Sequence, residues 1–111
     1  MFKNRDEGII LLMLETIGKI FLFTSDHNSA ETFEKDIESF DATVMNFIVL
    51  GEAVGRLSEP FKENHGQIDW RKIYAFRNVL AHDYFGIYSP EIWEIIRKHL
   101  PELKKSLENI L

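Results

Sequence analysis

The stretch SPEIWEIIRKHLPELKKSLENIL, residues 89–111, decides the fold class, because its apolar residues recur with the period of an α-helix. They would line one face of that helix: Trp93, Ile96, Leu100, Leu103, Leu107 and Ile110. Ser89 is a good capping residue, Pro90 suits the first helical position, and Glu91 favours the positive end of the helix dipole. Pro101 should kink the helix, because its ring displaces a backbone hydrogen bond.

The same periodicity runs through the rest of the chain, and no stretch shows the alternation of a half-buried strand. Further helices are expected at residues 4–24, 30–37, 41–57, 61–64 and 70–82. Asp41 and Asp69 are the expected N-caps of two of them, Pro60 separates the brief fourth segment from the helix before it, and Gly86 is a terminator after the fifth. We therefore expect an all-α bundle of four long helices with one or two short ones, in a single domain over residues 1–111.

Composition narrows the classes of function. The chain has 111 residues and no cysteine, which excludes disulfides and thiolate-metal sites and suits a reducing cytoplasm. Its longest apolar stretch, Ile9–Leu14, is too short to cross a membrane, and Asp6 and Glu7 precede it where a secretory signal would be positive. The net charge of −5 opposes non-specific binding of nucleic acid. The net charge is −6 over residues 1–55 and +1 over residues 56–111, so a polyanion would have to meet the second half.

Some candidate ligand positions have simpler structural explanations. Gly51 and Gly55 lie one turn apart on a helix, where close approach of a neighbouring helix is the favoured explanation and a ligand role the alternative. The basic segment 97–105 is expected to be a solvated helix face, with a phosphate-positioning surface as the other interpretation. Three histidines have no partner at a metal-ligand spacing and are expected to be exposed: His27, His65 and His99. The sequence therefore predicts no metal site and no cofactor.

The segment RNVLAHDYFG, residues 77–86, places polar residues in an otherwise apolar helix pattern. On an ideal helix Arg77 and Tyr84 share a face about 10 Å apart along the axis, and Asn78 shares another face with His82. Arg77 and His82 differ by about 140° in azimuth, so they do not simply stack. Two copies of the helix packed across a twofold axis would pool two arginines and two histidines.

Such a pooled site has the minimum set of groups for metal-independent RNA cleavage. One imidazole could take the proton from a ribose 2′-OH while another protonates the leaving oxygen, because histidine titrates near neutral pH. Arginine, which is permanently charged, suits the charge that builds up on phosphorus. On pattern alone, helix caps and salt bridges remain the commoner explanation for these residue types.

Residues 77–87, RNVLAHDYFGI, resemble the R-x-x-x-x-H-x-Y signature of HEPN-domain proteins, specifically of the HepT-like toxin family. Further landmarks fall in the family's order across nearly the whole chain: Arg5-Asp6, Ile48–Ala53, Arg56-Leu57-Ser58, Ile68-Asp69-Trp70 and Leu100–Lys104. The resemblance implies an all-helical HEPN fold, a homodimer with the motif in the interface cleft, and metal-independent ribonuclease activity. It also implies a toxin–antitoxin pair with a small MNT-type nucleotidyltransferase that neutralises the toxin by transferring AMP to the motif tyrosine.

Carried over by position, the resemblance makes Arg77 and His82 the catalytic residues, Tyr84 the adenylylated residue, and Asn78 and Asp83 supporting polar positions. An added phosphate beside the arginine would oppose entry of an RNA backbone.

The chain departs from the common pattern at Tyr88, where many relatives carry an acid, and at Asp69, where proline is common. A wide apolar stripe on the first helix independently predicts self-association: Leu11, Leu12 and Leu14. Two other functions stay open on the sequence. One is a non-enzymatic helical adaptor that binds a nucleotide or docks a nucleotidyltransferase, and the other is a structural dimer with an incidental polar cleft.

Overall fold

In the computed structural model, residues 4–111 are described, and they form helices and connecting turns without any strand. The helices are α1 (Arg5–Thr24), α2 (Ala30–Lys35), α3 (Ile37–Arg56), α4 (Glu59–Asn64), α5 (Trp70–His82), α6 (Ser89–Glu94) and α7 (Leu100–Ile110). A 3₁₀ turn, η1 (Tyr84–Gly86), follows α5, and a π-helical turn, η2 (Ile95–His99), joins α6 to α7. The prediction of an all-α fold with four long helices is confirmed.

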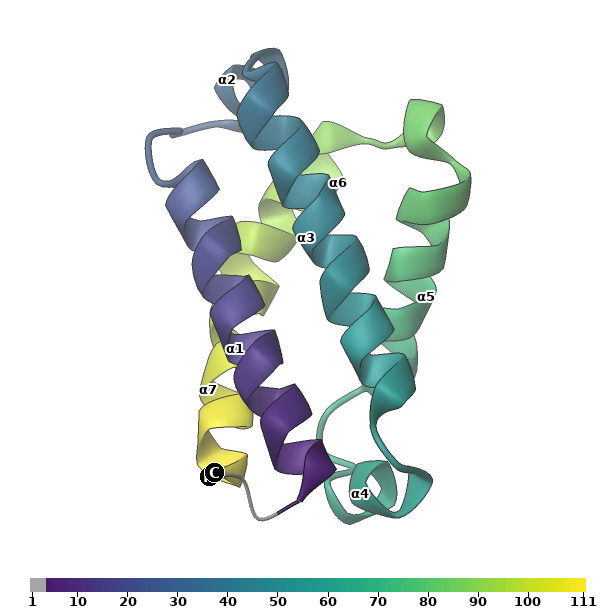
Figure 1. The fold of residues 1–111 in the computed structure, drawn as a ribbon. Coiled ribbons are helices and arrows are strands. Elements are labelled where there is room, and N and C mark those ends of the chain that lie inside the picture. Colours follow the sequence, from purple (N-terminus) through teal and green to yellow (C-terminus); the bar gives the residue numbers. More distant parts are fainter. Residues whose placement is uncertain (1–3) are drawn as a thin grey trace.

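The long helices pack around one apolar core. α1 lies against α3 on one side and α7 on another, while α5 packs along α3 at the edge of the bundle (Figure 1). Fully buried side chains come from most of the elements: Ile10, Met13, Ile17, Ile20, Phe33, Leu80, Ile92, Leu100 and Leu107. α5 contributes only Trp70 and Leu80 to the buried set, whereas α1 contributes seven residues. α5 thus contributes two buried residues, as few as α7 does.

The start of α3 differs from the prediction. The helix begins at Ile37, and its N-cap is Asp36, whose carboxylate accepts hydrogen bonds from the Ser39 N–H at 3.2 Å and the Ser39 hydroxyl at 2.8 Å. The predicted cap, Asp41, instead lies in the second turn of the helix and is exposed. The earlier cap prevails because His27, from the preceding loop, also holds the Asp36 carboxylate, at 3.0 Å.

Two other helix starts differ from the sequence prediction. Pro60 does not separate α4 from the chain before it but sits in the first turn of that helix, where a missing N–H leaves no hydrogen bond unmade. Ser89 is the first residue of α6 rather than its cap, and it is buried. Asp69 caps α5 as predicted, by accepting a hydrogen bond from the Lys72 N–H at 3.1 Å. Gly86 ends η1, not α5, which stops at His82.

The distortion expected at Pro101 takes the form of the π-helical turn η2. Proline at the start of α7 cannot donate to the carbonyl one turn earlier, and its ring crowds that carbonyl. The turn before it widens, so that the Leu100 N–H bonds the Ile95 carbonyl, five residues back. The apolar face nevertheless continues through the distortion, since Ile96, Leu100 and Leu107 are all buried.

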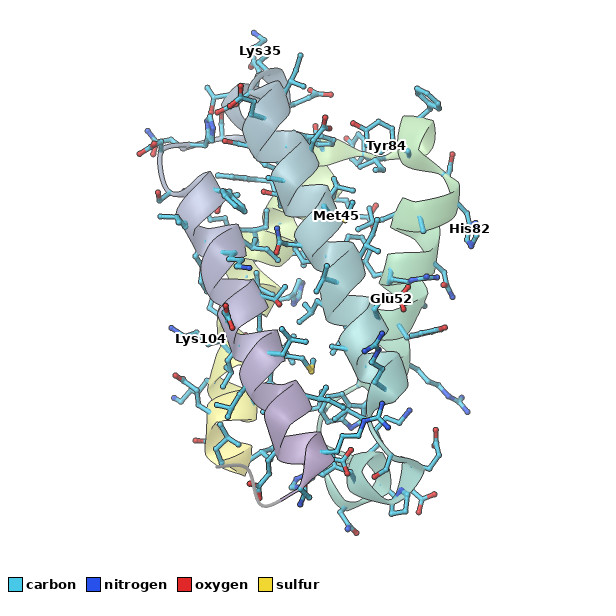
Figure 2. The ribbon with its side chains drawn as sticks, in the orientation of Figure 1. Lys35, Met45, Glu52, His82, Tyr84 and Lys104 are labelled. Carbon is cyan, nitrogen blue, oxygen red and sulfur yellow. The ribbon has the colours of Figure 1, made fainter. Side chains whose placement is uncertain are left out.

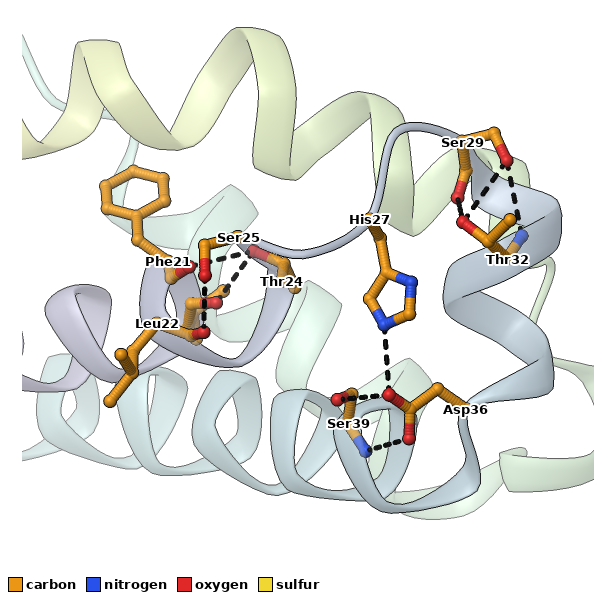
Figure 3. A network of polar contacts seen from close by, with 10 residues as sticks. Phe21, Leu22, Thr24, Ser25, His27, Ser29, Thr32, Asp36 and Ser39 are labelled. Atoms are coloured by element: carbon orange, nitrogen blue, oxygen red, sulfur yellow. Dashed lines mark hydrogen bonds and ion pairs between the residues drawn. The ribbon is translucent and has the colours of Figure 1, made fainter.

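The three histidines outside the motif do not share one environment. His27 is largely buried, against the prediction, because its ring bridges the loop after α1 to the Asp36 cap (Figure 3). Its backbone carbonyl accepts a hydrogen bond from Arg97 at 2.9 Å. His65 is half-buried on the ring of Phe61, with 4.5 Å between ring centroids, so the exposed position expected for it is also wrong. His99 is exposed, as predicted.

No helix within residues 4–111 has the length and apolar character that a membrane span requires.

Candidate functional site

Arg77 is seated where α5 crosses α3 most closely. A Cβ atom placed on Gly51 would lie 2.1 Å from the Arg77 Cβ, and one placed on Gly55 would lie 3.0 Å from the Tyr74 ring. Side chains of α5 therefore occupy the room that the two glycines of α3 leave, which confirms the predicted close helix approach. The small residue at position 51 lets the base of the arginine side chain press directly against the backbone of α3.

The guanidinium group of Arg77 is held by two oxygen acceptors at the edge of this contact. It donates to the Asn78 side-chain carbonyl at 2.7 Å and forms an ion pair with the Glu52 carboxylate. It also lies 5.9 Å from the centre of the Tyr74 ring. The side chain is 22% exposed, so the charged tip reaches the surface, while its Nε atom is buried and has no hydrogen-bond partner among residues 4–111. This arrangement fixes a permanent positive charge at the boundary between the core and the solvent.

His82 lies on a different side of the helix. It is the last residue of α5, and its side chain is exposed and points away from α3 (Figure 2). Tyr84, by contrast, lies on the side of α5 that faces α3, and Glu52 lies on α3 itself. Within residues 4–111, its imidazole makes no hydrogen bond or ion pair. One copy of the chain therefore does not bring His82 and Arg77 together, in keeping with their angular separation on an ideal helix.

Tyr84 turns back toward α3 from the 3₁₀ turn that follows α5. Its hydroxyl donates a hydrogen bond to the Asp41 carboxylate. That hydrogen bond raises the pKa of Tyr84 above its usual value of 10.0, with smaller contributions from desolvation and from the negative charge of Asp41. The phenol is therefore neutral at physiological pH, and its proton stays on the hydroxyl oxygen, which donates it in the hydrogen bond to the carboxylate.

Asp83 shapes the turn that carries Tyr84. It caps the end of α5, and its carboxylate oxygen lies 2.3 Å from the place where a Cβ on Gly86 would be. Only glycine fits at position 86 with this arrangement. The turn is closed by hydrogen bonds from the Gly86 N–H to the Asp83 carbonyl at 3.0 Å and from the Ile87 N–H to the Tyr84 carbonyl at 3.3 Å. Asp83 thus lies beside the site as a structural support of the turn.

Sequence reasoning missed the two carboxylates that α3 contributes. Glu52 holds Arg77, and Asp41 holds Tyr84. The two acids are eleven residues apart, which is about three helical turns and places them on one face of α3. That spacing was the available signal, but only the pairing of α3 with α5 reveals which residues the acids meet.

Beyond Asn78, an open depression continues toward the start of α5. It is bounded by α4, the loop at residues 66–69 and α5, and its lining includes Arg71, Tyr74 and Asn78. Both signs of charge line it, so it is not a basic groove. In the part of the chain that the structure describes, no cluster of three or more His, Asp or Glu side chains is arranged to hold a metal ion.

Comparison with known proteins identifies the family. Residues 13–110 match the family model described as "Ribonuclease HepT-like". The chain belongs to the HepT-like ribonuclease family. This assignment covers the crossing of α3 and α5, the motif and the final helix, and it supports ribonuclease activity for the chain.

Curated relatives agree with the assignment. A protein of Caldanaerobacter subterraneus subsp. tengcongensis named "Putative RNase" is 41% identical over 83 residues, covering 75% of this chain and 74% of the relative. A "Putative RNase" of Methanocaldococcus jannaschii is 35% identical over 99 residues, covering 89% and 81%. A "Probable ribonuclease HepT" of Thermococcus cleftensis is 30% identical over 80 residues, covering 72% and 73%. No solved structure gives a significant match to the chain.

Proposed function

We propose that the chain is the RNA-cleaving toxin of a HEPN/MNT toxin–antitoxin pair, and that its active site is completed by a second copy of the chain. The single observation that carries the proposal is the division of the motif between two sides of α5. Arg77 is fixed against α3 with its charged tip at the surface, while His82 is exposed and unpaired among the described residues. Both belong to the helix at the edge of the bundle, where another copy can approach.

The roles follow from the chemistry of the two groups. His82 exchanges protons with the ribose 2′-OH and the leaving oxygen, since an imidazole ring can both accept and release a proton. Arg77 stabilises the negative charge that develops on the pentacovalent phosphorus, and it must exchange its contact with Glu52 for the phosphate oxygens. A twofold axis beside α5 supplies a second histidine, so that one imidazole acts as the base and the other as the acid. The mechanism uses no metal ion.

Tyr84 is the proposed point of control. A nucleotidyltransferase of the MNT type would transfer AMP to its hydroxyl. The residue Tyr84 is 44% exposed, and it lies seven positions after Arg77 in the sequence. The added phosphate carries negative charge and bulk at the end of α5. An RNA backbone that crosses the end of α5 on its way to Arg77 would then meet a like charge. The partner is thus an enzyme that acts on the toxin.

The first test is cleavage of a defined RNA by unmodified protein in EDTA. Arg77→Ala and His82→Ala should each lower the rate by about 100-fold or more, the usual contribution of general acid–base or oxyanion groups. His99→Ala is the matched control, because His99 is also exposed but lies in η2, outside the motif. This substitution should leave the rate of cleavage unchanged. Intact RNA after incubation with folded wild-type protein would refute the enzymatic assignment and favour an adaptor.

A second test addresses the shared site. Wild-type and His82→Ala chains are unfolded together in equal amounts and refolded as a mixture, which forms mixed dimers. A mixed dimer holds only one of the two histidines and lacks either the base or the acid, so the mixture should cleave at about a quarter of the rate of the same amount of wild-type protein. A rate of about one half, which independent sites would give, with dimers verified by light scattering, would contradict a site built across two chains.

A further inference from the structure

Tyr84 and Asp41 form a contact between two elements far apart in the sequence. The tyrosine hydroxyl donates to the Asp41 carboxylate across 43 positions of the chain. The tyrosine is held by the closed 3₁₀ turn η1, and the acid is held in the regular helix α3. Neither backbone has to move to keep the two side chains together. The hydroxyl oxygen that would receive AMP is therefore already oriented by a carboxylate.

Asp41 has no other structural role in the described residues. The N-cap of α3 is Asp36, so the helix start does not depend on Asp41. The side chain is exposed, and the only hydrogen bond or ion pair that it makes within residues 4–111 is the one to Tyr84. An exposed carboxylate whose sole partner is a phenol is placed to act on that phenol.

We propose that Asp41 positions the Tyr84 hydroxyl and accepts its proton when the tyrosine is adenylylated, an inference that rests on the proposed function. In this step the Tyr84 oxygen forms a bond to the α-phosphorus of a nucleoside triphosphate delivered by the nucleotidyltransferase. The bond between that phosphorus and the oxygen bridging to the β-phosphorus breaks, and pyrophosphate leaves with the electron pair. The phenolic proton passes to Asp41, which becomes a neutral carboxylic acid.

An acceptor at this position is needed because the nucleophile starts as a neutral phenol. A phenol at neutral pH carries its proton, and the bonded carboxylate raises the pKa of Tyr84 further. The proton must therefore leave as the new bond to phosphorus forms. An aspartate that receives the proton of an attacking hydroxyl is a general solution in phosphoryl transfer, where orientation of the nucleophile matters more than the strength of the base.

The test is the rate of AMP addition to the full-length chain by its nucleotidyltransferase partner with ATP and Mg²⁺, followed by intact mass. Asp41→Asn keeps an oxygen that accepts the phenolic hydrogen bond but is not basic, so the catalytic rate constant should fall by about 100-fold with little change in KM for ATP. Glu38→Gln is the matched control, because it removes an exposed charge one turn away on the same helix and should be modified at the wild-type rate. Tyr84→Phe should take up no AMP.

The outcomes separate this inference from the proposed function. Modification of Asp41→Asn at the wild-type rate would overturn the inference alone. A wild-type chain that gains no AMP would overturn the proposed control by modification, and the role of Asp41 with it.

A second test does not need the partner enzyme. It measures the titration of Tyr84 as the absorbance difference between a chain and its Tyr84→Phe counterpart. Asp41→Asn should lower the pKa of Tyr84 toward 10.0, and an unchanged titration would refute the contact.

Discussion

The crossing of α3 and α5 makes a quantitative prediction about Gly51→Ala. The new methyl group would lie 2.1 Å from the Arg77 Cβ and 2.7 Å from its Cγ, and ordinary contact begins near 3.4 Å. The helices must therefore separate by about 1.3 Å, because the Cβ is fixed to the backbone and cannot rotate away. Overpacking of this kind costs about 1–3 kcal/mol. The better helix propensity of alanine returns about 1 kcal/mol.

Gly18→Ala isolates the packing cost. Gly18 lies in α1 with no atom within 4 Å of an added Cβ, so the substitution should gain the propensity term alone. Because that term is common to both variants, the difference between their unfolding free energies equals the overpacking cost, about 1–3 kcal/mol. Gly55→Ala should fall between the two, since the atom nearest its Cβ belongs to a tyrosine ring that can shift. Urea unfolding followed by circular dichroism, at one fixed protein concentration, measures all three. A Gly51→Ala variant as stable as Gly18→Ala would refute the close approach.

Three further predictions concern the core, the caps and the site. Leu107→Ala, at a fully buried position of α7, should destabilise the fold by about 2–5 kcal/mol, whereas Leu22→Ala, 70% exposed, should change stability by less than about 0.5 kcal/mol in urea unfolding. Hydrogen bonds from Ser39, and then from His27, lower the pKa of Asp36 below its usual 3.8. The ionised Asp36 cap therefore stabilises the fold fully above about pH 3.8, and this stabilisation is lost as the pH falls through the pKa of the folded state. Asp36→Asn should therefore show less loss of stability than wild type in urea unfolding between about pH 5 and pH 3. Glu52→Gln should raise the kcat/KM of RNA cleavage by up to about tenfold, because Arg77 then gives up a weaker contact before it binds phosphate, and a hydrogen bond between charged groups is worth about 1.5 kcal/mol.

Helical periodicity was enough to predict most of the fold. The apolar stripe of the last helix, which includes Leu107, and the cap at Asp69 are local features, and both are where the sequence placed them. The start of α3, by contrast, could not be predicted from the nearby sequence. Asp36 and Asp41 are equally good caps by residue type, and the choice depends on His27, which reaches Asp36 only after the loop has folded back. Competing caps are settled by tertiary contacts that a linear pattern does not contain.

In the candidate site, too, some features follow from the nearby sequence and others depend on how the helices pack. The angle between Arg77 and His82 follows from helix geometry, and the structure pairs Arg77 with Glu52 of α3 while His82 points away from α3 (Figure 2). The carboxylates that hold the motif, Glu52 and Asp41, depend on the register between α3 and α5. Nothing near Glu52 in the sequence indicates that its partner lies 25 residues later. Residues of a site that act through another helix become visible only when the packing is known.

The position of α5 at the edge of the bundle has a consequence for local stability. Its fully buried residues are Trp70 and Leu80, with Ile73 and Phe76 packed against the core beside them, so its detachment exposes less apolar surface than unfolding of α1 would. Regions of that kind open with a lower free energy than the whole molecule, and their amide hydrogens exchange with solvent first. The helix that carries the motif should therefore exchange its amides well before α1 does. The proposed modifying enzyme would then reach Tyr84, which follows α5, while the rest of the fold stays closed.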